Sequence, residues 1–187
     1  MTADSAAAAT TPIATSGPGR PRIAGGNKPT EPFPIHMKGP VVKGFGRANL
    51  PEDAITEQEK NMETGIYYGW AQVIVNCSGS SQGGDESSLS KTDEIFTVYP
   101  MVMSLGWNPF YKNEKKSAEV HIMHKFENDF YGDELRVVVL GYIRPELDYT
   151  TLEALIQDIN IDIEVAHNSL ARPAYAAFQN DPLFLVK

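Results

Sequence analysis

The strand-forming segments of this chain are separated by turns and loops rather than by helices, and this order constrains the fold most. Residues 65–75, 98–105, 117–122 and 135–143 are rich in β-branched and aromatic side chains. Parallel neighbours need a crossover connection, usually a helix, so this order favours an antiparallel sheet. Counting a short strand that opens at 41–42, we predict five or six strands that form a small barrel.

A single long helical pattern follows the last strand, and we predict a helix over residues 150–171. Thr150 and Glu153 have the spacing of a capping box, and Pro173 ends the pattern. The apolar positions that recur at helical spacing are Leu152, Leu155, Ile156, Ile159, Ile163, Ala166 and Leu170. This face should pack on the outside of the barrel, and we expect Asp158, Asp162 and Glu164 to face solvent. The apolar tail at 182–186 could dock back on the body.

The flanking and connecting segments differ in composition from the strands. Residues 1–31 are dominated by small and polar side chains, and we predict that they are disordered, with the folded domain at 32–187. A transit peptide is the alternative for this segment, since it carries Arg20 and Arg22. Residues 76–94 are rich in Ser and Gly and should form a flexible loop insertion, with a phosphorylatable regulatory loop as the alternative.

Charge and cysteine content exclude some classes of protein. The formal net charge is -8, and residues 1–31 carry three basic and two acidic residues, so the body has a net charge of about -9. An acidic body argues against phosphate-neutralising nucleic-acid binding. No apolar run is long enough to span a membrane. Cys77 is the only cysteine, which favours a reducing compartment such as the cytoplasm, with the mitochondrion as an alternative. We expect a monomer.

The predicted strand 117–122 carries the residues with the clearest chemical potential. Its alternation places Ser117, Glu119 and His121 on one face, beside a basic loop that contains Lys115 and Lys116. A carboxylate on a rigid strand can act as a general base. The competing interpretation is an ordinary ion pair with one of the two lysines, and spacing alone favours that interpretation.

Seven segments, in order, carry a family resemblance: GPVVKGFGR, TGIYYGWA, SLGWNPFYKN, KSAEVHIMHKF, DFYG, LGYIRPELDY and LEALIQDINIDIEVA. Over residues 34–186 the chain resembles the riboflavin kinases, or flavokinases. The resemblance implies a six-stranded Greek-key barrel that transfers the γ-phosphoryl of ATP to the 5′-hydroxyl of riboflavin. The products are FMN and ADP, and the reaction requires Mg²⁺, with Zn²⁺ as an alternative metal.

The resemblance also assigns roles to individual residues. Glu119 matches the catalytic base, Asn49 a metal-side residue and Arg144 a flavin-side arginine. The residues that match the nucleotide side are Gly44, Gly46, Arg47, Ile122, His124 and Tyr131. Read without the family, Ile122 is a core residue, His124 a surface histidine and Tyr131 a turn anchor. Arg144 would then pair with Glu146 at the end of its strand.

One departure from the family concerns the glycine loop. The family reads GFGRGS-x-x-LG-x-PTAN, whereas Arg47 is followed here directly by Ala48 and Asn49. The absent stretch includes a threonine that binds magnesium in the family, and loss of an oxygen ligand should weaken the Mg²⁺·ATP site. The alternative function is therefore a flavin-binding barrel with impaired catalysis, and a third reading is a barrel that cannot close. Because the sequence resumes in frame, a splicing or gene-model gap is favoured over an evolved loss.

Overall fold

The computed structural model describes residues 19–43, 48–50, 61–74, 97–107, 116–127 and 129–185. Several predictions fall outside these ranges. They concern residues 1–18, Gly44, Gly46 and Arg47, the loop at 76–94, and Lys115.

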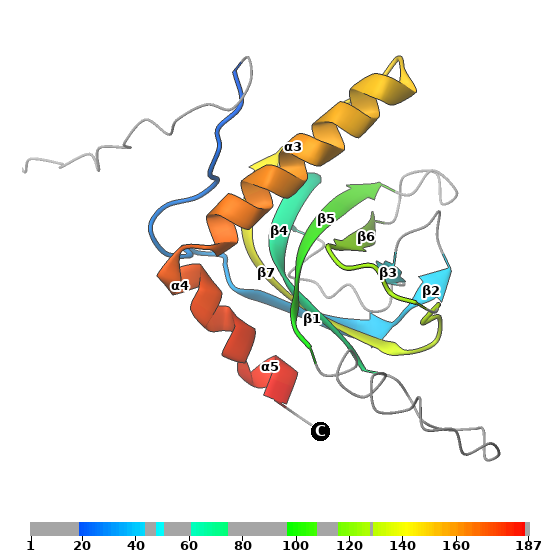
Figure 1. The fold of residues 1–187 in the computed structure, drawn as a ribbon, viewed down its shortest axis with the longest axis vertical. Coiled ribbons are helices and arrows are strands. Elements are labelled where there is room, and N and C mark those ends of the chain that lie inside the picture. The colour runs from blue at the N-terminus through cyan, green and yellow to red at the C-terminus, as the bar shows by residue number, and fades with distance from the viewer. Residues whose placement is uncertain are drawn as a thin grey trace, which may run out of the picture.

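The described strands form one antiparallel sheet that curls around a common core (Figure 1). Its strands are β1 (Ile35–Pro40), β2 (Val42–Lys43), β3 (Ala48–Leu50), β4 (Gly65–Ile74), β5 (Tyr99–Trp107), β6 (Lys116–Ile122) and β7 (Glu134–Arg144). Their order in the sheet is β1-β7-β4-β5-β6-β3-β2. β4, β5 and β6 are consecutive neighbours and β7 returns beside β4, which is a Greek key. Six of these described strands have three or more residues, so the predicted barrel is confirmed.

β7 contributes one face to each of two hydrophobic cores, one inside the barrel and one beneath the helices. Val137 and Val139 point into the barrel, whereas Val138 and Leu140 point outward beneath the helices, and all four are at most 1% exposed. The prediction that the centre of this strand is buried on both faces is confirmed.

The prediction missed β1 and placed a strand only at 41–42. β1 alternates, because Ile35 and Met37 are buried while His36 and Lys38 are exposed. Its register puts Ile35 opposite Val139 of β7. The alternation lasts only four residues before Gly39 and Pro40, which is too short to outweigh the turn signal.

β6 has the predicted alternation. Ala118, Val120 and Ile122 are buried in the barrel, which leaves Glu119 and His121 on the outer face. Lys116 lies on the inner side, where its ammonium donates to Met62 O at 2.5 Å, and burial lowers its pKa. The alternative in which Glu119 pairs with Lys116 is therefore disfavoured.

The long helix α3 (Leu152–Leu170) packs outside the barrel, as predicted (Figure 1). Its cap is Thr151 and not Thr150, since Thr151 Oγ1 accepts from the Ala154 N–H at 3.2 Å. The predicted apolar face is correct only in the second half of the helix. Leu152 and Ile156 are 64% and 50% exposed, because the first half of α3 extends past the sheet.

Asp162 corrects the predicted solvent-facing side of α3. It is 2% exposed, because two arginines from other parts of the chain bind its carboxylate. Glu164, by contrast, has a side chain that is 51% exposed, as predicted.

Three short helices follow: α4 (Pro173–Ala176), η3 (Ala177–Asn180) and α5 (Pro182–Leu185). Phe184 of α5 is 6% exposed and joins the outer core, so the predicted docking of this tail is confirmed. None of the helices in the described ranges has the length and apolar character that crossing a membrane requires.

Residues 19–31 do not match the predicted disorder. Ala24 is 4% exposed and joins the core beneath α3. Composition does not reveal these contacts, because backbone groups make them with helices far along the chain.

Candidate functional site

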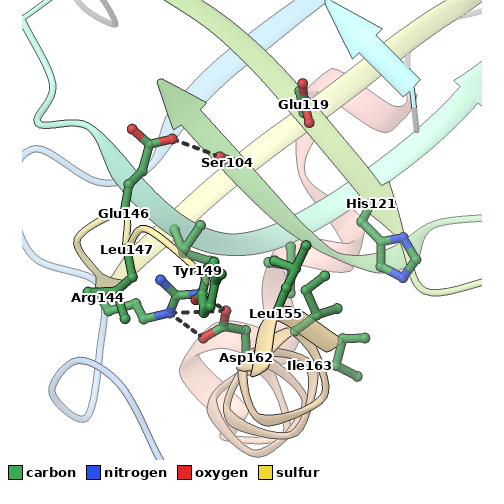
Figure 2. Close-up of a pocket in the computed structure, with 13 residues that line it drawn as sticks. Ser104, Glu119, His121, Arg144, Glu146, Leu147, Tyr149, Leu155, Asp162 and Ile163 are labelled. Atoms are coloured by element: carbon green, nitrogen blue, oxygen red, sulfur yellow. Dashed lines mark hydrogen bonds and ion pairs between the residues drawn. The ribbon is translucent and has the colours of Figure 1, made fainter. Parts of the chain in front are cut away.

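A cavity of about 440 Å³ lies between the outer face of the sheet and the first part of α3. We call it the larger cavity. Its lining residues are Ile66, Val102, Ser104, Glu119, His121, Arg144, Glu146, Leu147, Tyr149, Leu155, Ile159, Asp162 and Ile163. Figure 2 shows Glu119 and His121 on the strand side, and Leu155 and Ile163 reaching in from the helix. Two of the residues that the sequence singled out, Glu119 and Arg144, therefore lie in one cavity.

Sheet register places five residues in one row across the strands. Asn49 of β3 is opposite Glu119, which is opposite Ser104 of β5. Ser104 is in turn opposite Ile66 of β4, which is opposite Arg144 of β7. Directly opposite residues in an antiparallel sheet project from the same face. We call this set the transverse row; it links the metal-side, base and flavin-side candidates.

Arg144 is held by Asp162 and not by Glu146. Its Nε donates to Asp162 Oδ1 at 3.0 Å and its Nη2 to Asp162 Oδ2 at 2.7 Å. Burial disfavours the charge on Arg144, but the hydrogen bonds and negative charge of Asp162 outweigh it and raise the pKa of the guanidinium. Arg144 therefore stays cationic at the cavity wall.

Glu146 has a different partner from the one predicted. Ser104 Oγ donates to Glu146 Oε1 at 3.3 Å, which links β5 to the segment after β7 (Figure 2). The ion pair predicted between Arg144 and Glu146 is wrong, because the guanidinium turns toward the helix.

Tyr149 completes the polar end of the larger cavity. Its hydroxyl donates to Asp158 Oδ2 at 2.7 Å. Burial and this hydrogen bond raise the pKa of Tyr149, while the nearby charge of Arg144 lowers it. Tyr149 therefore remains a neutral phenol.

A second cavity of about 200 Å³, the smaller cavity, lies on the other side of β6. Its lining residues are Val41, Ala48, Val120, His121, Ile122, His124, Phe126, Asp129, Phe130 and Tyr131. His121 lines both cavities. The structure thus brings together Ile122, His124 and Tyr131, the three described residues that the resemblance placed on the nucleotide side.

Aromatic rings dominate the wall of the smaller cavity. The His124 ring stacks on Tyr99, with centroids 4.1 Å apart, and meets the edge of Phe126. His124 is therefore part of a ring cluster rather than a surface histidine. Tyr131 is 44% exposed, which corrects its interpretation as a turn anchor; Phe130 packs against the core instead.

Asn49 has a property expected of a metal-side residue. Its Oδ1 is buried and accepts no hydrogen bond from any described residue. A buried acceptor normally has a partner, and oxygen is the donor that Mg²⁺ prefers. Within the described ranges no group of three or more His, Cys, Asp or Glu side chains could hold a metal. A single amide oxygen fits a cation that takes its remaining oxygen ligands from phosphate or water.

Sequence reasoning missed Asp162, Tyr149 and Ser104 as cavity residues. Tyr149 belongs to the LGYIRPELDY segment, and the period of β5 places Ser104 on its outer face. Asp162 had a usable signal too, since it lies between Ile161 and Ile163 on a helix that packs on the barrel, and a charged residue in such a position needs a partner.

Comparison with known proteins identifies the family. The family model described as "Flavokinase: Riboflavin kinase" matches residues 31–170. The chain belongs to the riboflavin kinase family. A riboflavin kinase from Lodderomyces elongisporus is 45% identical over 173 residues, covering 81% of this chain and 91% of the relative. One from Pyricularia oryzae is 46% identical, covering 83% and 81%.

The fold agrees with this assignment. The crystal structure of riboflavin kinase from Trypanosoma brucei is similar, with a TM-score of 0.63 and 26% identity, covering 86% of this chain and 92% of that one. As a member of the riboflavin kinase family, the chain has the mainly β fold and the enzyme class that the resemblance implied.

Proposed function

We propose that this protein transfers the γ-phosphoryl of Mg²⁺·ATP to the 5′-hydroxyl of riboflavin. The observation that carries the proposal is the position of Glu119, which lines the larger cavity and stands opposite Asn49 in the transverse row. Its carboxylate lies between the cavity that carries Arg144 and the strand that carries the candidate metal-side oxygen. Family membership supports the substrate.

Riboflavin is assigned to the larger cavity. The volume suits a three-ring ligand, and the walls combine apolar helix residues such as Leu155 and Ile159 with a few polar groups. Arg144 could donate to a carbonyl oxygen of the flavin, whereas Tyr149, whose hydroxyl proton goes to Asp158, could accept a hydrogen bond from the ligand. The ribityl chain would then run along the sheet toward Glu119.

ATP is assigned to the smaller cavity. His124, Phe126 and Tyr131 offer ring surfaces against which a purine can pack. Since His121 lines both cavities, the two substrates would approach one another beside His121 of β6.

The chemistry follows from this placement. Glu119 accepts the proton of the riboflavin hydroxyl while that oxygen forms a bond to the γ-phosphorus. The bond to the β-phosphate oxygen breaks, and ADP leaves. Phosphoryl transfer depends mainly on positioning and charge stabilisation. When bound, Mg²⁺ would neutralise phosphate charge, and Asn49 would be the protein group that holds it.

The test is the chain itself, incubated with riboflavin, ATP and Mg²⁺, with FMN separated by chromatography. Glu119→Gln should lower kcat by about 10²- to 10⁴-fold, the usual contribution of a positioned base. Glu153→Gln, at an exposed position on α3, is the matched control and should retain activity. Near-parental turnover in Glu119→Gln would contradict the role of Glu119.

The alternative of impaired catalysis depends on the short connection between β2 and β3, where the family's longer loop is absent. β3 still pairs with β6 and keeps Asn49 opposite Glu119, which argues that the barrel forms despite the missing stretch. Inserting the family's loop between Arg47 and Ala48 tests the alternative directly. FMN formation only after the insertion would show that the parent chain does not carry out the phosphoryl transfer, and riboflavin binding by that parent would then support the alternative.

A further inference from the structure

Residues 19–26 lie along α3 and α4, and we call them the N-terminal strap. The strap lies outside residues 31–170, which the family model matches. Its contacts are to α3, α4 and β4, the elements around the outer core.

Side chains from three elements hold the strap by its backbone. Arg172 donates through Nη2 to Ala24 O at 2.7 Å and through Nη1 to the Gly25 and Gly26 carbonyls. Tyr68 of β4 donates to Ala24 O at 2.9 Å. Carbonyls that meet an arginine fork and a buried phenol are held at defined positions.

Two further hydrogen bonds hold the strap, one at a backbone N–H and one at a carbonyl. Ala24 N donates to Ser169 Oγ at 2.9 Å, and Ser169 is fully buried in α3. Tyr175 of α4 donates to Gly26 O at 3.0 Å. The strap is thus a fixed part of the domain, so that a side chain projecting from it has a defined reach.

Arg20 projects from the strap to the end of the larger cavity. Its Nη1 donates to Asp158 Oδ1 at 2.8 Å and its Nη2 to Asp162 Oδ1 at 2.5 Å. The Arg20 side chain is 21% exposed, and that of Asp162 only 3%. In such surroundings an ion pair is weakly screened and directional.

Each of these two aspartates also binds a residue of the cavity wall. Asp162 binds Arg144 through both of its oxygens, and Asp158 accepts from Tyr149. Two arginines and two aspartates balance in charge. Without Arg20, the two carboxylates would share one arginine, so both Arg144 and Tyr149 could change position.

We propose that the N-terminal strap positions the riboflavin-contacting wall, with Arg20 acting through Asp162 and Asp158 on Arg144 and Tyr149. Arg20 itself lines neither cavity, so it is a positioning residue. The inference rests on the proposed function for the identity of the ligand. It predicts a defect in flavin binding and not in the chemical step, because the proposed base Glu119 lies on β6, outside the network of Arg20, Asp158 and Asp162.

The experiment compares riboflavin binding, measured by quenching of flavin fluorescence, in the parent and in Arg20→Ala. The variant should bind about 3- to 30-fold more weakly, the range expected for coupled neighbours. In turnover assays KM for riboflavin should rise, while kcat and KM for ATP change little. Arg20→Lys keeps the charge but loses the fork, so its affinity should be intermediate.

Arg22→Ala is the matched control. Arg22 lies in the same strap, but its contact with Glu164 is 3.9 Å long and both side chains are more than half exposed. Such a pair contributes little, so riboflavin affinity should stay within about twofold of the parent.

A double-mutant cycle distinguishes positioning from general destabilisation. In an Arg144→Gln background, Arg20→Ala should weaken riboflavin binding much less than it does in the parent. Equal loss in both backgrounds, or parental affinity in Arg20→Ala, would overturn the inference. If Arg20→Ala does not fold, Arg20→Lys supplies the same comparison. A parent protein that binds no riboflavin would instead overturn the proposed function, and the ligand of this inference with it.

Discussion

The larger cavity ends in charged groups that already bind one another, whereas the smaller cavity is bordered by aromatic rings and lies next to the strand that carries Asn49. Arg144 has Asp162, and Tyr149 has Asp158. Asn49 Oδ1 has no hydrogen-bond partner in the described part of the chain. The first arrangement fixes donors before a ligand arrives, and the second leaves an acceptor for a ligand to complete.

This difference fits the two proposed substrates. A neutral flavin carries no strong charge that could orient protein side chains, so the protein itself must hold the hydrogen-bonding groups that face the flavin. A nucleotide brings its own charge and cation, and can supply the missing partner. The contrast yields four tests, given from the largest expected effect to the smallest.

Removing Asp162 should have the largest effect on stability. Asp162→Asn would leave Arg144 and Arg20 without the buried carboxylate that binds both. Breaking a buried pair by removing one partner costs about 3–5 kcal/mol. Urea unfolding should show that loss in the free energy of unfolding. Glu164→Gln on the same helix, half exposed, should change it by less than about 0.5 kcal/mol. Equal effects in the two variants would contradict the buried network.

Asn49→Ala should separate nucleotide binding from stability. A hydrogen bond or ligand contact to a charged group contributes about 1.5–3 kcal/mol, so KM for Mg²⁺·ATP should rise about tenfold or more. The melting temperature should stay unchanged or rise, since the substitution removes a buried oxygen that has no partner among the described residues. Riboflavin affinity is the internal control and should not change. A large fall in melting temperature with unchanged KM would assign Asn49 a structural role.

Gly25 tests the anchoring of the strap. Its φ is +74°, and a Cβ there would lie 2.9 Å from the Tyr68 hydroxyl and 3.0 Å from that of Tyr175. Gly25→Ala should therefore cost about 1–2 kcal/mol of stability through backbone strain, and weaken riboflavin binding through Arg20. Gly26→Ala is the control, because the nearest atom to its added Cβ is Lys28 O at 3.9 Å. Matching melting curves for the two variants would contradict this account.

The smallest effect concerns alkaline pH. Burial, followed by the nearby Tyr142 and Glu63, raises the pKa of Tyr67 from its ordinary value of 10.0 to about 12. Between these values the unfolded chain loses the phenolic proton while the folded chain keeps it, so stability falls as pH rises. The contribution is complete below pH 10. Tyr67→Phe should make this decline shallower in urea titrations, and an unchanged slope would contradict the shift.

The sequence predicted those features that depend on neighbours along the chain. The period of two placed Glu119 and His121 on one face of β6, and the apolar run at 135–143 predicted the double-sided burial of β7. The family resemblance then placed Glu119 and Arg144 in one site, and the structure puts both in the larger cavity.

The missed features depend on partners far apart in sequence. Asp162 looked like a solvent-facing helix residue, because Arg144 is 18 residues away and Arg20 is 142 residues away. Helical spacing describes which side a residue occupies but not what lies opposite. The strap was missed for a similar reason: its anchoring groups are backbone carbonyls, which composition does not distinguish.

The transverse row has a consequence for how loop lengths can vary in this fold. Neighbouring strands lie about 4.8 Å apart, so the hydrogen-bond ladder spaces Asn49, Glu119 and Arg144 at whole multiples of that step. A one-residue insertion within a strand would turn its row member to the other face. Insertions or deletions between strands leave the row unchanged, as the four-residue connection between Lys43 and Ala48 illustrates. Loops of different lengths can thus alter nucleotide handling while the proposed base keeps its place.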